Sequence, residues 1–514
     1  MSKTIIIIGA GLAGLSAALQ AAENGCNVKL VSSLPSERAQ SVMAEGGINA
    51  ALNTKDENDS PEEHFTDTIK AACGLADPNA VWGMTQAAPE LVHWLLKLGV
   101  KFNMSGYDDV DLRNFGGQKK KRTAFAQSDT GKQIMTAMID AVRRKEASGM
   151  VERFSHHSFL TLRLCGNICC GCVIRDEYSQ ETVELPGDAV IVATGGMHGL
   201  FGNTTGSLSN TGEVTAELFR LGVPLANGEM IQYHPTTVKC GGKRMLISEA
   251  ARGEGGRLFA MKDGKQWYFM EEKYPELGNL MPRDITAREI WKVSHESEVF
   301  LDMTEISEEI ISNKLSGLAD DCMTYLHKDI RKEPVSVLPG IHYFMGGILV
   351  DEQHRTPVQN LYAAGECCAQ YHGANRLGGN SLLGALYGGR VAAKSACEQA
   401  DVVDLSCATQ IDFPPTSQIS EIKKLNKVMQ DTMGVVRNEN TLLNGIQTVQ
   451  ALTGNLPLLG MAVLKSALAR KESRGAHWRE DYPKSNDNDY LKTTVARFDG
   501  KQIQISLVPV PERR

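Results

Sequence analysis

An apolar run followed at once by three spaced glycines is the feature that most constrains this chain of 514 residues. Residues 4–8 (TIIII) are apolar or β-branched, and residues 9–14 (GAGLAG) follow directly. An alanine- and leucine-rich stretch predicts a helix to about Asn24, and residues 28–31 (VKLV) predict a second strand. This order indicates a βαβ unit that opens a doubly wound sheet and binds a dinucleotide at its glycine-rich turn.

The three glycines have separate expected roles. Gly9 allows a tight turn, Gly11 allows close approach of a pyrophosphate, and Gly14 allows close helix–strand packing. The pyrophosphate then lies at the positive end of the helix. The second strand ends in Ser32-Ser33, where an acid usually binds the ribose. A serine hydroxyl can also bond a ribose, so this motif alone leaves NAD and FAD both open.

Four further segments favour FAD. Residues 41–48 (SVMAEGGI) follow the second strand, and residues 193–196 (ATGG) end a later strand with small residues against which a cofactor can lie. Residues 363–366 (AAGE) end another strand in an acid that can accept a ribityl or ribose hydroxyl. Residues 380–383 (NSLL) open a helix whose N-terminal amides can stabilise negative charge on a reduced isoalloxazine ring.

Length and composition narrow the class of protein. The chain is long enough for roughly three domains of about 150 residues, and a net charge of −7 argues against nucleic acid as the main partner. No apolar run approaches the roughly 18 residues of a membrane span, and no secretory signal precedes the first strand. The twelve cysteines lack the spacing of a zinc, iron–sulfur or haem site. We therefore expect no metal, reduced thiols and a cytoplasmic location.

The pattern along the chain predicts an α/β protein with three parts. Residues 1–226 and 342–400 are expected to form a discontinuous, Rossmann-like FAD-binding domain. Residues 227–341, which are rich in charge, are expected to form an inserted α+β capping domain. Residues 401–514 are expected to form a mainly helical C-terminal domain with a late strand at 502–507.

Longer motifs resemble those of a known family. Residues 115–117 (FGG) with 122–126 (RTAFA), residues 372–382 (HGANRLGGNSL) and residues 470–477 (RKESRGAH) carry the likeness. The chain resembles the flavoprotein subunits of fumarate reductases and succinate dehydrogenases, from residue 4 to about 400 and again near residue 470. Aspartate oxidase and the wider set of flavin-dependent enoate reductases are relatives of that family. The resemblance implies electron transport in anaerobic respiration.

The resemblance also supplies site residues. Substrate-binding residues are implied at His234, Ser248 (usually threonine), His342 and Arg376. The residues implied to hold FAD are Gly9, Gly11, Gly14, Ser32, Ser41, Gly46, Gly47, Ala193, Thr194, Gly195, Glu213, Glu366, Ser381 and Leu382. Two arginines and neutral polar groups suit a dicarboxylate, because a guanidinium matches a carboxylate bidentately.

The expected reaction is hydride transfer from flavin N5 to an alkene carbon, with proton donation by Arg283 to its neighbour. A guanidinium is an unusual acid, since it stays protonated across the accessible pH range. Its proton must therefore be replaced at once, and the resemblance gives Glu249 and Arg252 as relay partners. These two residues could instead form a structural ion pair.

Gln40 departs from the family. The membrane-bound members of the family attach FAD covalently through a histidine at this position. Glutamine lacks the nucleophilic imidazole nitrogen that forms this bond. We therefore expect non-covalent FAD and, because covalent attachment accompanies succinate oxidation in the family, a bias toward fumarate reduction.

The electron source and two other function classes stay open at this point. The expected electron donor is a separate protein, for example an iron–sulfur subunit, or a small reduced carrier. Direct hydride supply by NADH is a further alternative. Any membrane contact is expected to come through a partner. An aspartate-oxidase-like or succinate-oxidising enzyme is the alternative function, and a non-catalytic FAD-binding assembly subunit is a distant one.

Overall fold

A parallel five-stranded sheet is the frame of the molecule. The computed structural model describes residues 2–106, 109–401, 411, 413, 415 and 418–514. The sheet has the order β20-β10-β1-β2-β6, built from Leu361–Ala363, Ala189–Val192, Thr4–Ile8, Asn27–Ser32 and Val151–Ser155. All its neighbouring strands run parallel. The strand–turn–helix–strand order predicted from the glycine motif is therefore present.

Strand β1 is buried on both faces, which explains its unbroken apolar run. Ile5 and Ile7 pack in one core with α1 (Leu12–Glu23), α4 (Thr130–Ala147) and α11 (Asn380–Gln399). Ile6 and Ile8 point the other way, into a second core. That core includes strand β8 (Ile168–Asp176), which lies in an antiparallel sheet with β7 (His157–Cys165) and β9 (Thr182–Pro186).

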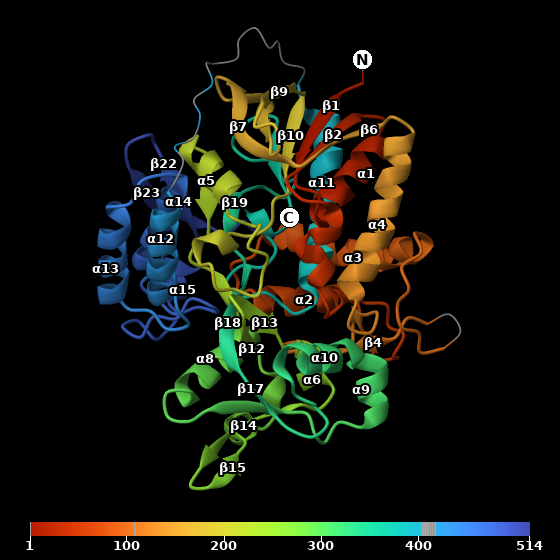
Figure 1. The fold of residues 1–514 in the computed structure, drawn as a ribbon, viewed down its shortest axis with the longest axis vertical. Helices are drawn as coiled ribbons and strands as arrows, with labels where there is room; N and C mark the ends of the chain where they lie inside the picture. Colours follow the sequence, from red (N-terminus) through yellow and green to blue (C-terminus); the bar gives the residue numbers. More distant parts are fainter. Residues whose placement is uncertain (1, 107–108, 402–410, 412, 414, 416–417) are drawn as a thin grey trace.

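A separate core lies in the middle of the chain, drawn green at the foot of Figure 1. This part of the chain combines a sheet of β12 (Ile231–Cys240), β13 (Lys243–Leu246) and β18 (Leu338–Phe344) with one of β14 (Arg257–Lys262), β15 (Lys265–Trp267), β16 (Val299–Asp302) and β17 (Val335–Ser336). Its helices include α6 (Glu249–Gly253) and α8 (Arg283–Val293). This mixture is the α+β insert that the sequence predicts, while the boundaries at 226/227 and 341/342 stay a prediction.

The C-terminal part contributes helices α12 (Ile419–Thr432), α13 (Glu439–Gln450) and α14 (Asn455–Ala469), at the left of Figure 1. Its last strands, β22 (Lys492–Phe498) and β23 (Ile503–Pro509), form a hairpin that extends a sheet from the preceding part of the chain. The pairing joins β22 to β11 (Leu225–Ala226). The predicted late strand is thus present, and the last part of the chain shares a sheet with earlier residues.

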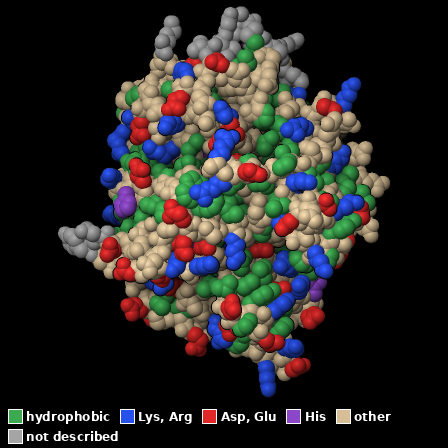
Figure 2. Space-filling view, turned by 180° about the vertical axis from the view of Figure 1, so that it is seen from behind, with side chains coloured by type: hydrophobic (Ala, Val, Ile, Leu, Met, Phe, Trp, Pro, Cys, Tyr) green, Lys and Arg blue, Asp and Glu red, His purple; other side chains and the backbone are tan. Residues whose placement is uncertain are grey.

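The structure can be compared with the predictions about membrane spans and reduced thiols. On the face seen in Figure 2, acidic and basic side chains are interspersed. In the part of the chain that the structure describes, no helix is long and apolar enough to cross a membrane. The clustered cysteines, Cys169, Cys170, Cys172, Cys367 and Cys368, are free thiols. Cys165 is disulfide-bonded, so the prediction of reduced thiols is wrong at that position.

Gly11 and Gly14, at the start of α1, have different surroundings. A Cβ atom on Gly14 would lie 1.8 Å from the Gly9 carbonyl oxygen, which confirms the predicted close packing of helix and strand. A Cβ atom on Gly11 would meet only Ser41 Oγ at 3.6 Å and Ala39 Cβ at 3.8 Å, which are ordinary contacts. The protein alone therefore tolerates a side chain at Gly11 but not at Gly14.

We predict that Gly14→Ala and Gly11→Ala fail in different ways. Gly14→Ala should destabilise the fold by about 1–3 kcal/mol, because backbone must move. Gly11→Ala should cost at most about 1 kcal/mol, as alanine is a poorer N-cap than glycine, yet it should weaken FAD binding. Urea unfolding and flavin titration measure the two effects, and equal losses of stability in both variants would contradict the assignment.

Candidate functional site

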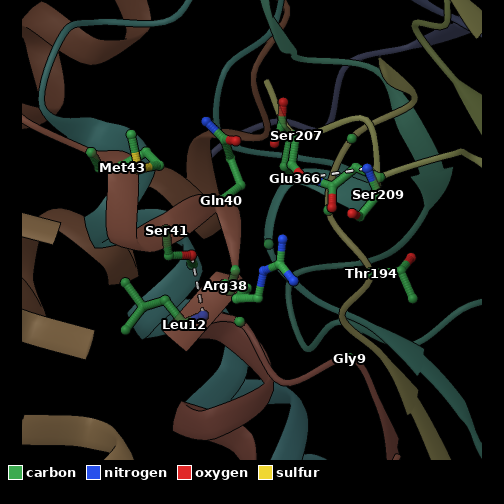
Figure 3. Close-up of a pocket in the computed structure, with 18 of the residues that line it drawn as sticks. Gly9, Leu12, Arg38, Gln40, Ser41, Met43, Thr194, Ser207, Ser209 and Glu366 are labelled. Atoms are coloured by element: carbon green, nitrogen blue, oxygen red, sulfur yellow. Dashed lines mark hydrogen bonds between the residues drawn. The ribbon is translucent and has the colours of Figure 1, made fainter. Parts of the chain in front are cut away.

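One large cavity runs from the glycine turn to the capping insert. Its volume is about 930 Å³. The N-terminus of α1 and the first turn of α11 both open on it, so two helix dipoles present their positive ends to the same space. In Figure 3, Gln40 and Ser41 lie on one side of this space, and Thr194, Ser207 and Ser209 lie on the other.

The residues of the first turn fit an FAD diphosphate and ribose. Gly11 lines the cavity and is the N-cap of α1, where backbone amides meet an anion. The Leu12 amide donates to Ser41 Oγ at 3.2 Å, which fixes the neighbouring segment against the helix end (Figure 3). Ser32 Oγ is buried and has no hydrogen-bond partner among the described residues, so it is free to bond a ribose hydroxyl.

A buried carboxylate organises the opposite end of the cavity. Glu249 Oε2 lies 2.6 Å from Arg283 Nη2, and Glu249 Oε1 lies 3.3 Å from Arg252 Nη2. The Gly116 amide donates to Glu249 Oε1 at 3.2 Å. Burial raises the pKa of Glu249, but the charges of Arg283 and Arg252 outweigh it and hold the pKa below its ordinary value. Glu249 is therefore an anion shared by two arginines.

Local structure explains these positions. Glu249 and Arg252 are three apart on α6, so their side chains share a face of the helix. Arg283 is the first residue of α8, after the N-cap Pro282. A cation is disfavoured at a helix N-terminus, so the bonds to Glu249, and a bond of 3.1 Å from Arg283 Nη1 to Gln232 Oε1, compensate for that position.

Two histidines face each other from neighbouring strands. His234 on β12 and His342 on β18 have ring centroids 5.1 Å apart, because the two strands pair antiparallel. Burial, then the charge of Arg283, lowers the pKa of both rings well below its ordinary value, so both are neutral. The Thr205 hydroxyl lies 2.8 Å from His342 Nδ1. If it donates to that atom, Nε2–H is left to donate to a ligand.

Arg376 completes the cluster. Its guanidinium carbon lies 4.2 Å from the centre of the Tyr343 ring, a cation–π contact that holds the group in place. Burial, then the charge of Arg283, lowers the pKa of Arg376 to about 9. Arg376 Nε and His234 Nε2 are buried and have no hydrogen-bond partner within the described ranges.

The charges of this cluster define what it can bind. Arg252, Arg283 and Arg376 are all at most 6% exposed, and Glu249 balances only one of them. Buried positive charge is costly unless an anion pairs with it. Two positive charges of the three arginines therefore remain to pair with a dianion, and the neutral histidines can donate further hydrogen bonds to it.

The cavity gathers nearly all the residues predicted from the sequence. Those that line it are Gly9, Gly11, Ser32, Ser41, Gly46, Gly47, Ala193, Thr194, Gly195, Glu213, His234, Ser248, Glu249, Arg283, His342, Glu366, Arg376, Ser381 and Leu382. Gly14 does not line it, because its place is the contact between helix and strand. Arg252 lies behind Glu249 and reaches the cavity only through that carboxylate.

Two polar residues at the site were not assigned a role from the sequence. Thr205 bonds His342 from 137 positions away, and no spacing signals that contact. Glu45 belongs to the segment 41–48 that was predicted to meet FAD, and its side chain lines the cavity. Burial raises its pKa to about 8, so it is largely neutral at physiological pH. In the described ranges, no group of three or more His, Cys, Asp or Glu side chains could hold a metal ion.

Fold and cavity together define an FAD-dependent oxidoreductase. The FAD binding domain family matches residues 4–382, and the family described as fumarate reductase flavoprotein C-term matches residues 453–513. The chain belongs to the succinate dehydrogenase/fumarate reductase flavoprotein family, whose enzymes act on a CH–CH bond.

Three relatives show how far the likeness extends. The succinate dehydrogenase flavoprotein subunit of Bacillus subtilis (strain 168) is 38% identical, with 100% of this chain and 98% of the relative covered. The 8-methylmenaquinol:fumarate reductase flavoprotein subunit of Wolinella succinogenes is 31% identical, with 100% and 92% covered. A solved structure of E. coli quinol fumarate reductase FrdA has a TM-score of 0.90 at 27% identity, with 99% and 97% covered.

Proposed function

We propose that this protein reduces fumarate, or a closely related 2-enoate, to the saturated dicarboxylate. The observation that carries the proposal is a buried cluster at the end of an FAD-binding cavity, in which Glu249 pairs with Arg252 and Arg283 while Arg376 lines the same cavity. Such a cluster suits a small dianion. It argues against an aspartate oxidase, which needs an acid for the substrate ammonium, since Glu249 is already engaged by two arginines. It also argues against a non-catalytic assembly subunit.

The side chains of the cluster divide into two tasks. Arg376, His234, His342 and Ser248 hold the substrate carboxylates and stabilise the negative charge that grows on one of them during reduction. FAD, once bound and reduced by the electron donor, would supply the hydride from N5. Arg283 gives a proton to the neighbouring carbon.

A chain of contacting side chains can return a proton to Arg283 after it has donated one. Glu249 Oε2 contacts both Nε and Nη2 of Arg283, and Glu249 Oε1 contacts Arg252. A proton can therefore pass from Arg252 through Glu249 to Arg283 as the first one leaves. Because this line is buried, the restored charge stays next to the substrate.

The electron donor is proposed to be a separate protein or a small reduced carrier. Relatives of this chain are described as flavoprotein subunits, which supports a partner subunit. We propose that the protein works in the cytoplasm and meets a membrane only through such a partner.

Reduction is the proposed direction because Gln40 stands where a covalent link would form. Succinate oxidation is the competing candidate, since the Bacillus subtilis relative is described as a succinate dehydrogenase. With an artificial reductant, fumarate turnover should far exceed succinate turnover with an artificial acceptor. Arg376→Ala serves as the control that should lower both rates. Comparable rates in the wild type would favour the competing candidate.

A second prediction concerns the bond to FAD. Gln40 lines the cavity but has no nucleophilic imidazole nitrogen. Acid precipitation should therefore release all the flavin into the supernatant. Flavin colour that stays in the washed, denatured pellet would show a covalent bond and contradict the prediction.

A third prediction separates proton donation from binding. Arg283→Lys keeps the charge but loses the fork that contacts Glu249 and Gln232, so turnover should fall by about 10²–10⁴, the range for a positioned acid. Fumarate affinity should change much less, because Arg376 and the histidines remain. Arg376→Ala should weaken affinity as well as turnover.

Fumarate titration of the oxidised flavin spectrum, alongside steady-state rates, measures both quantities. Near-normal turnover in Arg283→Lys would leave Arg283 as a carboxylate clamp and remove it as the acid.

A further inference from the structure

Two thiols lie close together in the part of the protein built from the five-stranded parallel sheet, α1, α4 and α11, which we call the FAD-binding half. They lie at the ends of α1 and α11 that are remote from the cavity. Cys26 Sγ and Cys397 Sγ are 2.8 Å apart, although 371 positions separate the residues in the chain. The distance exceeds the S–S bond of about 2.05 Å by less than one ångström. Both cysteines are free thiols in the structure.

Both cysteines lie at or near the C-terminal end of a helix. Cys26 lies between the end of α1 and the start of β2, and its amide donates to the Ala21 carbonyl at 3.0 Å. Cys397 lies in the last turn of α11, where Lys3 Nζ donates to its carbonyl at 2.8 Å. Both thiols therefore sit on backbone that is fixed by hydrogen bonds, so the sulfur atoms are held close together.

The helices that end at these thiols begin at the cofactor cavity. Gly11 caps the start of α1, and Ser381 lies in the first turn of α11; both line the cavity. The two helices also pack in the same apolar core. A covalent link between Cys26 and Cys397 would fasten their far ends without adding any group to the site.

We propose that Cys26 and Cys397 form a reversible disulfide that fastens α1 to α11 and makes the FAD-binding half more resistant to heat. A small-molecule disulfide is the oxidant. The Cys397 thiolate attacks one of its sulfur atoms and releases a thiolate, and Cys26 then attacks Cys397 and releases a second one. The two cysteines lose two electrons and two protons, and the small disulfide becomes two thiols.

Accessibility sets the order of these steps. Cys397 is half-buried and can meet the oxidant, whereas Cys26 is 5% exposed and reacts only with its neighbour. Burial, then the neighbouring Cys26 sulfur, raises the pKa of the Cys397 thiol. Because the thiolate is the attacking species, oxidation should be slow at neutral pH and faster in mild alkali.

The test compares oxidised and reduced holoenzyme. Purified protein is incubated with oxidised glutathione, remaining thiols are blocked with N-ethylmaleimide, and linked peptides are identified by tandem mass spectrometry. We expect a Cys26–Cys397 link and a midpoint for heat-induced FAD release higher by roughly 4–8 °C. Dithiothreitol should reverse both effects.

Matched variants make the result specific. Cys26→Ser and Cys397→Ser should each lose the link and the shift in midpoint, whereas Cys73→Ser, which changes another half-buried thiol, should keep both. Fumarate turnover at moderate temperature should be the same in the oxidised and reduced forms. Failure to find the link in oxidised wild type would overturn the proposal, as would an unchanged midpoint shift in Cys26→Ser. Neither outcome would bear on fumarate reduction.

Discussion

The buried carboxylate of Glu249 is the interaction on which the rest of the site depends. It accepts a hydrogen bond from Arg283 Nε, forms ion pairs with Arg283 Nη2 and Arg252 Nη2, and accepts a hydrogen bond from the Gly116 amide. Removal of one partner from such a cluster leaves uncompensated buried charge, which costs about 3–5 kcal/mol. The same carboxylate therefore keeps two arginines in place and sets the charge that remains for a substrate.

The fold brings this cluster to the cofactor by joining distant segments. The antiparallel pairing of β12 and β18 places His234 beside His342. Gly116, which comes before the capping insert in the chain, reaches Glu249 within it. Gln232 bonds both Arg283 and the Arg376 backbone, so the insert is tied to the segment that leads into α11. The residues proposed to bind substrate and those proposed to bind FAD thus line one cavity, although they come from different parts of the chain.

Sequence reasoning was strongest where a residue type alone limits the backbone. The run of isoleucines predicted a strand, which the structure shows buried on both faces, and Gly14 was correctly predicted to allow close packing of helix and strand. The resemblance to the family predicted which arginines and histidines would meet. It did not show that Arg252 lies behind Glu249, because that depends on which face of a short helix meets the cavity. Contacts between remote residues, such as Thr205 with His342 and Cys26 with Cys397, had no signal in spacing or periodicity.

The most direct test of the account is a single turnover without oxygen. The holoenzyme is reduced with one equivalent of dithionite and mixed with fumarate, while flavin absorbance and succinate are followed together. The account predicts rapid return of the oxidised flavin spectrum and one succinate for each FAD. A flavin that stays reduced in the presence of fumarate, with no succinate formed, would contradict it.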